Sequence, residues 1–178
     1  MVKIYVIDTN VLIQNPQALL SFEDNQVILP VVVLEELDNL KKAEGEKGRN
    51  ARAATRILEE LRLKGNLLEG VKLESQGIVR VEKNYIDVKL PEDLPEDKMD
   101  NRILKVCRGL ADTSGEQVVL VTKDILLRIK AQIIGIRAED YTTEQVVEYE
   151  GQYKGRIEVY VPEEKFKDFK KKGVPVEE

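Results

Sequence analysis

Short runs of consecutive apolar residues recur along the chain, separated by stretches in which apolar residues return every three or four positions. Four of these runs are rich in Val and Ile and have the length of strands; they cover residues 3–7, 26–33, 77–82 and 118–122. Strands that are apolar on both faces favour a sheet covered on both sides, which is typical of parallel sheets. The pattern therefore predicts an α/β protein.

Helical spacing of apolar residues appears between the runs, over residues 34–42, 50–62, 100–111 and 124–134. We expect Asn50 to cap the second of these helices, while Asp100 and Asp124 open the last two. Residues 45–49 and 89–98 are predicted to be loops. This alternation predicts a three-layer α/β/α fold around a central, mostly parallel sheet of the Rossmann-like kind.

The chain changes character near its end. Residues 1–148 are expected to form one domain, and residues 149–178 a tail or linker in which the stretch RIEVYV alternates like an edge strand. The first residues do not predict a secretion signal, since Lys3 alone is too little for its basic segment and Asp8 interrupts the apolar stretch. No run is long enough to predict a membrane span, so we expect a cytoplasmic protein that does not bind membranes.

Composition removes several kinds of chemistry. The chain contains no histidine, which excludes Ser-His-Asp triads, Cys-His pairs and most zinc sites. Its one cysteine, Cys107, excludes an internal disulfide. Catalysis would therefore depend on carboxylates, hydroxyls, Lys, Tyr or a metal ion held by oxygen ligands.

Acidic residues recur just beyond the predicted strands, and Asp8, which interrupts an apolar stretch, is the most unusual of them. Groups beyond the carboxyl ends of parallel strands meet at one edge of the sheet. Glu35 or Glu36, Asp100 and Asp124 are expected to join Asp8 there. Carboxylates so close together need a cation, and Mg²⁺ or Mn²⁺ fits oxygen ligands best. Taken singly, Asp100 and Asp124 are better explained as helix caps, and either glutamate as part of a solvated helix face; the joint pattern is what favours a metal site.

Four segments together resemble the PIN domain family, and most closely the PIN domain that precedes the ATPase domain of PhoH-like proteins. They are IDTNVLI, VVVLEELDNLKK, DNRILKVC and VLVTKDILLRIKAQIIGI, in this order over roughly residues 3–141. The resemblance implies a metal-dependent ribonuclease whose catalytic metal ligands are Asp8, Glu36, Asp100 and Asp124. Glu35 stays an alternative to Glu36, and Asp97 to Asp100.

Three further residues beside these acids, Thr9, Asn10 and Thr122, are candidates to orient the carboxylates or bound water. Asp38 is interpreted as a surface acid and Asp140 as a turn residue. The resemblance also implies an ATPase domain in a longer chain, although these residues contain no GxxxxGK[ST] phosphate loop. A homo-oligomer and a separate antitoxin partner remain open.

A basic stretch offers a surface for the RNA backbone. Its candidate RNA-binding residues are Lys41, Lys42, Arg49, Arg52 and Arg56, the three arginines sharing one helical face. The alternative is a solvated face that pairs with neighbouring glutamates. Aromatic residues for base stacking are few, with Tyr5, Tyr85 and Tyr141 as candidates and Tyr5 expected in the core.

Three functions follow, in decreasing order of support. The first is a Mg²⁺- or Mn²⁺-dependent endoribonuclease acting on single-stranded RNA. The second is a catalytically weak PIN-fold module that binds RNA or protein. The third is a phosphoacceptor domain, which is disfavoured because such domains carry an acidic pair after the first strand, where this chain has Asp8 followed by Thr9 and Asn10.

Overall fold

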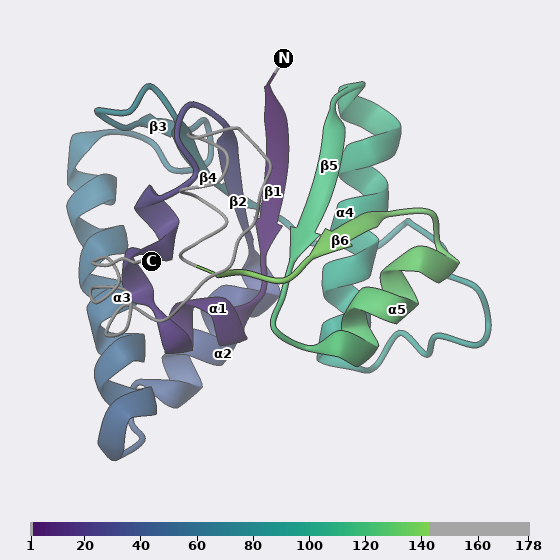
Figure 1. The fold of residues 1–178 in the computed structure, drawn as a ribbon, viewed down its shortest axis with the longest axis horizontal. Coiled ribbons are helices and arrows are strands. Elements are labelled where there is room, and N and C mark those ends of the chain that lie inside the picture. The colour runs from purple at the N-terminus through teal and green to yellow at the C-terminus, as the bar shows by residue number, and fades with distance from the viewer. Residues whose placement is uncertain (1, 143–178) are drawn as a thin grey trace, which may run out of the picture. The chain divides into compact units, whose positions relative to one another are not determined.

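The first strand, β1 (Lys3–Ile7), lies inside a sheet rather than at its edge. The computed structural model describes residues 2–142 and arranges their six strands in the order β3-β4-β2-β1-β5-β6 (Figure 1). All neighbouring strands are parallel except β3 and β4, which are antiparallel. The remaining strands are β2 (Gln26–Pro30), β3 (Val71–Lys72), β4 (Ile78–Glu82), β5 (Gln117–Val121) and β6 (Arg137–Glu139). The predicted mostly parallel sheet is confirmed.

Helices connect the strands and complete the three-layer α/β/α fold. They are α1 (Thr9–Gln14), a short 3-10 helix η1 (Pro16–Leu20), α2 (Val31–Leu40), α3 (Gly45–Lys64), α4 (Met99–Ser114) and α5 (Ile125–Ile133). Figure 1 shows α1, α2 and α3 beside the β4 side of the sheet and α4 and α5 beside the β5 side. Within the described part of the chain, none of these helices has the length and apolar character that crossing a bilayer requires.

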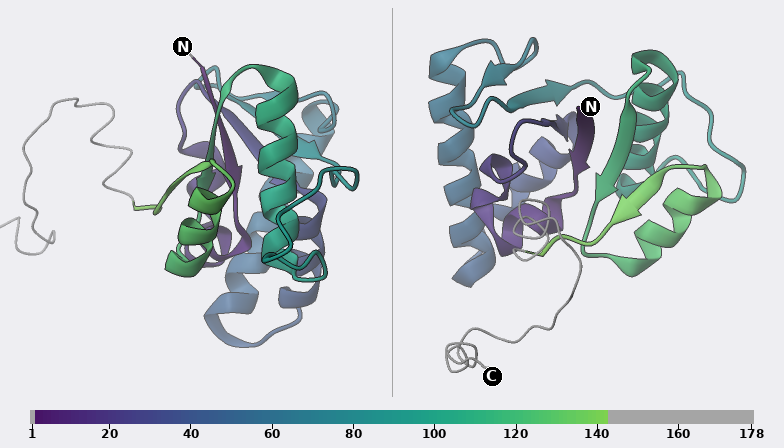
Figure 2. Two further views of the ribbon diagram at one scale, coloured as in Figure 1. Left: turned by 90° about the vertical axis from the view of Figure 1, so that its right-hand side faces the viewer. Right: turned by 45° about the horizontal axis from the view of Figure 1, so that its top comes forward.

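The core follows from the strand sequences. Consecutive residues of a strand point to opposite faces of the sheet, and Ile4, Tyr5, Val6 and Ile7 are all buried. Both faces of β1 are therefore covered, as its uninterrupted apolar run predicted, and the side views show the strands enclosed by helices (Figure 2). Tyr5 lies in the core, as expected.

The predicted strand over residues 26–33 was wrong at its end. The strand stops at Pro30, and Val31, Val32 and Val33 form the first turn of α2. Val32 and Val33 are fully buried in that helix. An apolar run gives the same hydrophobic signal in a buried strand and a buried helix, so it could not locate the boundary.

The predicted loop over residues 45–49 was also wrong, and so was Asn50 as a cap. Helix α3 begins at Gly45, and Asn50 lies within it, donating a side-chain hydrogen bond to the carbonyl of Ile13. A Cβ on Gly48 would lie only 1.8 Å from the Ala43 carbonyl oxygen, so this glycine allows the close turn between α2 and α3. Residues 89–98 contain no helix or strand, as predicted.

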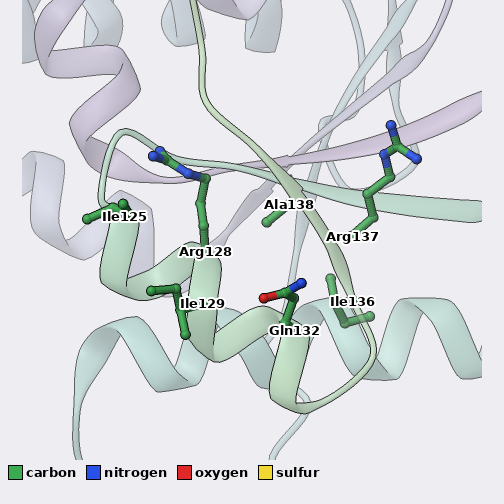
Figure 3. Close-up of a pocket in the computed structure, with 7 residues that line it drawn as sticks. All are labelled: Ile125, Arg128, Ile129, Gln132, Ile136, Arg137 and Ala138. Atoms are coloured by element: carbon green, nitrogen blue, oxygen red, sulfur yellow. The ribbon is translucent and has the colours of Figure 1, made fainter.

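The predicted division at residue 148 and the RIEVYV strand lie outside the described residues and stay predictions. Within them, the chain up to Tyr141 forms one compact unit. Its last helix carries four large apolar side chains that are about half exposed or more: Ile125, Leu126, Ile129 and Ile133. A pocket between this helix and β6 has Arg128 toward one end and Arg137 toward the other (Figure 3).

Candidate functional site

Asp8 follows β1 directly and begins helix α1. Its backbone N–H donates to the Val121 carbonyl of the neighbouring β5 over 3.0 Å, which continues the β1–β5 pairing. Its side chain caps the helix, because Oδ1 accepts the N–H of Thr9 at 2.7 Å. The second oxygen, Oδ2, accepts the Thr122 hydroxyl at 2.7 Å. Both carboxylate oxygens thus have neutral donors, and only 7% of the residue is exposed.

Burial dominates the electrostatics of this carboxylate. Desolvation, with smaller additions from the charges of Glu36 and Asp124, raises the pKa of Asp8 from 3.8 to about 6. The hydrogen bonds from Thr122 and Thr9 act in the opposite direction. Among the residues that the structure describes, no Lys or Arg forms an ion pair with Asp8.

Glu36 reaches the site from α2. Its carboxylate accepts a hydrogen bond from the Thr9 hydroxyl, the residue next to Asp8. Glu36 is half-buried and its charge acts on Asp8, whereas Glu35 is exposed. The structure therefore places Glu36 beside Asp8, and the Thr9 hydroxyl joins Glu36 to the residue next to Asp8.

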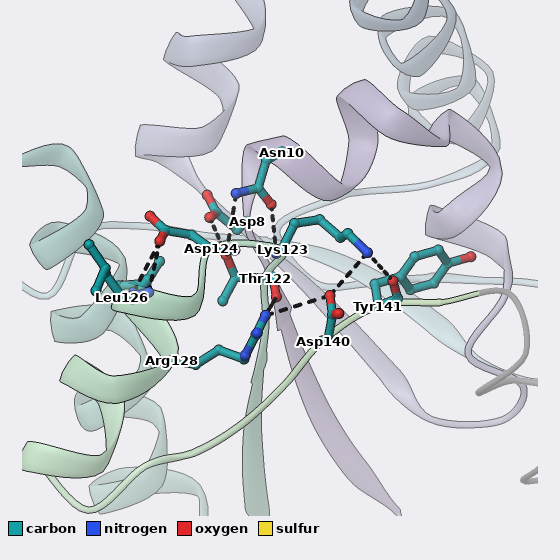
Figure 4. Close-up of polar contacts among 10 residues, drawn as sticks. Asp8, Asn10, Thr122, Lys123, Asp124, Leu126, Arg128, Asp140 and Tyr141 are labelled. Atoms are coloured by element: carbon teal, nitrogen blue, oxygen red, sulfur yellow. Dashed lines mark hydrogen bonds and ion pairs between the residues drawn. The ribbon is translucent and has the colours of Figure 1, made fainter.

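Asp124 and Thr122 complete the cluster from the end of β5 (Figure 4). The Asp124 carboxylate caps α5 by accepting the N–H of Leu126 at 2.9 Å, so the helix-cap interpretation of this residue is correct. Its backbone N–H donates to the Thr122 hydroxyl over 3.0 Å. Asn10 supports the same turn, because its Oδ1 accepts the N–H of Lys123 at 3.1 Å.

Asp100 lies in a different environment, in the first turn of α4. Its carboxylate forms an ion pair with Lys130 of α5, with 3.0 Å between Oδ2 and Nζ. It does not appear among the groups whose charge acts on Asp8. Asp97, the alternative ligand, is exposed in the preceding loop. The structure thus brings three of the four predicted acids together and pairs the fourth with a cation.

Comparison with known proteins places these features in a family. A family model described as "PIN domain" matches residues 5–142. The chain belongs to the PIN domain family. PIN domains are typically nucleases and generally use divalent metal ions.

Several named proteins resemble this PIN domain. Protein PhoH2 of Bacillus subtilis (strain 168) is 43% identical over 175 residues, which is 95% of this chain and 40% of that protein. Protein PhoH2 of Thermobispora bispora is 39% identical over 145 residues, 81% of this chain and 33% of that protein. The chain therefore spans at most about two fifths of these curated relatives, which are longer proteins.

A solved structure supports the fold. A PilT N-terminus domain protein from the archaeon Sulfolobus solfataricus P2 matches with a TM-score of 0.52 at 13% identity, over 87% of this chain and 99% of that one. At this identity the likeness concerns the fold alone.

The residues of the cluster offer the kind of ligand atom that a divalent ion prefers, but their side chains are not positioned around an ion. Asp8, Glu36 and Asp124 offer the carboxylate oxygens that Mg²⁺ and Mn²⁺ prefer. Between residues 2 and 142, no group of three or more Asp, Glu, Cys or His side chains is arranged to hold a metal ion. These carboxylates accept hydrogen bonds from protein donors, so they would have to be rearranged to bind an ion.

The predicted RNA-binding residues on and before α3 differ in what they contact. Arg49 and Arg56 are exposed on the helix, and so is Lys42 just before it. Arg52 is also exposed, but it donates to the Lys41 carbonyl over 2.7 Å and so fastens the turn between α2 and α3. The Lys41 ammonium pairs with Asp38 at 3.0 Å. This basic face is therefore partly structural.

Two of the tyrosines considered for base stacking are unsuited to it. The Tyr141 ring is buried against Phe22, with 5.9 Å between ring centroids. The Tyr85 ring packs onto α4 at Gly109, where a Cβ would lie 2.3 Å from the ring. Both rings belong to the packing of the domain, which corrects their interpretation as base platforms.

Sequence reasoning missed the charged residues around the β5–α5 turn. Asp140, interpreted as a turn residue, pairs with Lys123 at 3.1 Å and with Arg128 at 3.6 Å. Lys130, which holds Asp100, also had no assigned role. Their charges were visible in the sequence, but no spacing rule links residue 140 to residue 128 or residue 130 to residue 100.

Proposed function

We propose that this PIN domain is a divalent-metal-dependent endoribonuclease that cleaves single-stranded RNA at the Asp8 cluster. The observation that carries the proposal is the buried Asp8 carboxylate, which two neighbouring carboxylates repel and no protein cation neutralises within the described residues. Burying such a charge is unfavourable unless a partner neutralises it. A Mg²⁺ or Mn²⁺ ion from solution would supply that partner.

Asp8, Glu36 and Asp124 would hold the ion, and bound Mg²⁺ or Mn²⁺ supplies an acidified water and neutralises charge on the phosphate. The protein contributes fixed geometry. Thr122 orients Asp8 through its hydroxyl, and Thr9 links the backbone beside Asp8 to Glu36. Asn10 fixes the turn that carries Asp124, by accepting the N–H of Lys123. Asp100 would join as a fourth ligand only after leaving Lys130.

Binding of the RNA backbone is assigned to the exposed basic residues Lys42, Arg49 and Arg56, with Lys41 and Arg52 beside them. Contacts of this kind recognise phosphates and not sequence, and they weaken with salt. With Tyr5 and Tyr141 buried and Tyr85 packed onto α4, base stacking would contribute little. An ATPase domain in a longer chain remains a proposal that the greater length of the PhoH2 relatives makes reasonable.

A second candidate is a PIN-fold module that binds RNA or protein and cleaves weakly. It is favoured by the Asp100–Lys130 pair, which occupies one of the predicted ligands. The exposed apolar side chains of α5 add a surface suited to a protein partner. Metal dependence of cleavage separates the two candidates.

The test is cleavage of labelled single-stranded RNA in Mn²⁺, Mg²⁺ or EDTA. Asp8→Asn and Glu36→Gln should abolish cleavage, whereas the adjacent control Glu35→Gln should retain it, because Glu35 is exposed and it is Glu36 that contacts Thr9 in the cluster. Circular dichroism would show that each variant is folded. Cleavage that survives EDTA or Asp8→Asn would refute the proposal. No cleavage by the wild type in either metal would favour the binding module.

A further inference from the structure

Three residues from two segments meet behind the site, on the side of Thr122 away from Asp8 (Figure 4). Asp140 follows β6, and its Oδ1 lies 3.1 Å from the Lys123 ammonium and 3.6 Å from the Arg128 guanidinium. Lys123 also donates to the Tyr141 carbonyl over 2.9 Å. Lys123 from the β5–α5 turn and Arg128 from α5 therefore converge on one carboxylate, which follows the edge strand β6.

Arg128 links this ion pair to the backbone of Thr122. Its NH1 donates to the Thr122 carbonyl over 2.8 Å, and the Thr122 N–H donates to the Glu139 carbonyl over 3.1 Å. Both backbone polar groups of Thr122 are thus held by contacts that involve β6 or Asp140. The Thr122 hydroxyl then donates to Asp8 over 2.7 Å.

We propose that Asp140 is a positioning residue for the acid cluster. By holding Arg128 against the Thr122 carbonyl, it fixes the hydroxyl that orients Asp8. The consequences for metal binding and cleavage rest on the proposed function, whereas the coupling from Asp140 to Thr122 rests on the contacts alone. Residues that hold a metal ligand in place without touching the metal typically change metal affinity or activity by about 10- to 100-fold when they are altered.

Asp140 is not needed to hold the chain that follows β6 against the domain. Tyr141 already holds the chain beside β6, because its ring is buried next to Phe22 and its hydroxyl lies 3.2 Å from the Ser21 hydroxyl. The contribution specific to Asp140 is its charge, which lies next to Arg128 and Lys123. Loss of that charge would leave Arg128, whose side chain is 23% exposed, free to turn away from Thr122.

The chain offers a matched control in α4. There Asp112 pairs with Arg108 at 2.9 Å, and Arg108 donates to the Ile134 carbonyl over 2.7 Å. This arrangement also joins an aspartate, an arginine and a backbone carbonyl, although here the ion pair lies within one helix and is hydrogen-bonded. Asp112→Asn therefore removes the same kind of ion pair without touching the acid cluster.

The first measurement is NMR of the metal-free protein. Asp140→Asn should move the Thr122 methyl and Asp8 amide signals, while Asp112→Asn should leave both in place. Arg128→Gln should move the same two signals and serves as the second variant if Asp140→Asn does not fold. Shifts confined to Lys123, Arg128 and Tyr141 would overturn the proposal, whether or not the protein is a nuclease.

The second measurement is Mn²⁺ affinity by calorimetry, well below the unfolding temperature of every variant. Asp140→Asn should weaken binding about tenfold and lower kcat without changing KM for RNA, and Asp140→Glu should restore most of the affinity. A lower unfolding temperature with unchanged affinity would mean a purely structural role and would overturn the proposal. If the wild type neither binds Mn²⁺ nor cleaves RNA, the proposed function fails, and the NMR result decides the positioning role.

Discussion

Asp8 and Asp100 both follow strands of the same sheet, but the protein stabilises their charges in different ways. Asp8 is almost fully buried and accepts hydrogen bonds from neutral groups, the N–H of Thr9 and the hydroxyl of Thr122. Asp100 is more exposed and lies 3.0 Å from the ammonium of Lys130. Among the described residues Asp8 has no cationic partner, whereas Asp100 has one in Lys130.

The difference shows which acid a metal ion would stabilise most. Neutral donors favour an ionised carboxylate only partly, so burial still raises the pKa of Asp8 to about 6. A divalent cation would bind there without displacing any protein cation. At Asp100 it would have to compete with Lys130. Asp8 is therefore expected to contribute more to metal binding than Asp100.

The largest expected effect tests this ranking. Asp8→Asn should weaken Mn²⁺ binding by on the order of 100-fold or more, whereas Asp100→Asn should weaken it by about tenfold or less. Isothermal titration calorimetry at pH 7.5 measures both. Equal losses in the two variants would show that Lys130 releases Asp100 and that the comparison fails.

The second prediction concerns pH in EDTA. The pKa of Asp8 is raised from 3.8 to about 6 in the folded protein, mainly by burial. The stability that protonated Asp8 contributes is complete below pH 3.8 and is lost as the pH rises through about 6. Relative to Asp8→Asn, which lacks this titration, the wild type should lose up to about 3 kcal/mol of unfolding free energy across that range.

Urea unfolding of both proteins between pH 4 and pH 7.5 gives this difference. Comparing wild type with Asp8→Asn at each pH cancels the titration of the groups that do not interact with Asp8. A difference that stays constant with pH would contradict the raised pKa of Asp8 and, with it, the contrast with Asp100.

A smaller effect is expected from the hydroxyl that holds Asp8. Thr122→Val keeps the shape but leaves the Asp8 oxygen and the Asp124 N–H without a buried partner, which should cost about 1–3 kcal/mol of unfolding free energy. Thr113→Val is the control, because Thr113 is exposed near the end of α4 and its hydroxyl donates to the Gly109 carbonyl within the same helix. Similar losses in the two variants would argue against a special role for Thr122.

The smallest expected effect concerns Asp100 and its ion pair with Lys130. Lys130→Gln removes the partner of Asp100, and because both side chains are partly exposed, stability should fall by no more than about 1 kcal/mol. Mn²⁺ affinity should rise, since Asp100 becomes available as a ligand. An unchanged or lower affinity in calorimetry would show that Asp100 does not reach the ion.

Much of the fold could be predicted because its strands are apolar on both faces. The runs at β1, β4 and β5 gave those strands to within a residue at each end, and their alternation with helices gave the parallel sheet. The failures have a common cause. Residues 31–33 are buried in a helix, and Gly48 serves a close turn, so tertiary packing decided what the local pattern left ambiguous.

The candidate site could be predicted in part for the same reason. Strand ends meet at one edge of a parallel sheet, and the structure accordingly places Asp8, Glu36 and Asp124 near one another. The Asp100–Lys130 and Asp140–Arg128 pairs depend on how α5 is oriented against α4 and β6. No periodicity encodes that orientation, so these pairs became visible only in three dimensions.

The position of β1 between β2 and β5 also affects how the protein is made. Asp8 is synthesised before Thr122, its hydrogen-bond partner, which follows 114 residues later. At about 5–20 residues per second, roughly 6 to 23 seconds of translation separate the two. Throughout that interval the nascent chain carries Asp8 without the strand that completes its surroundings, so the acid cluster cannot assemble until β5 has left the ribosome.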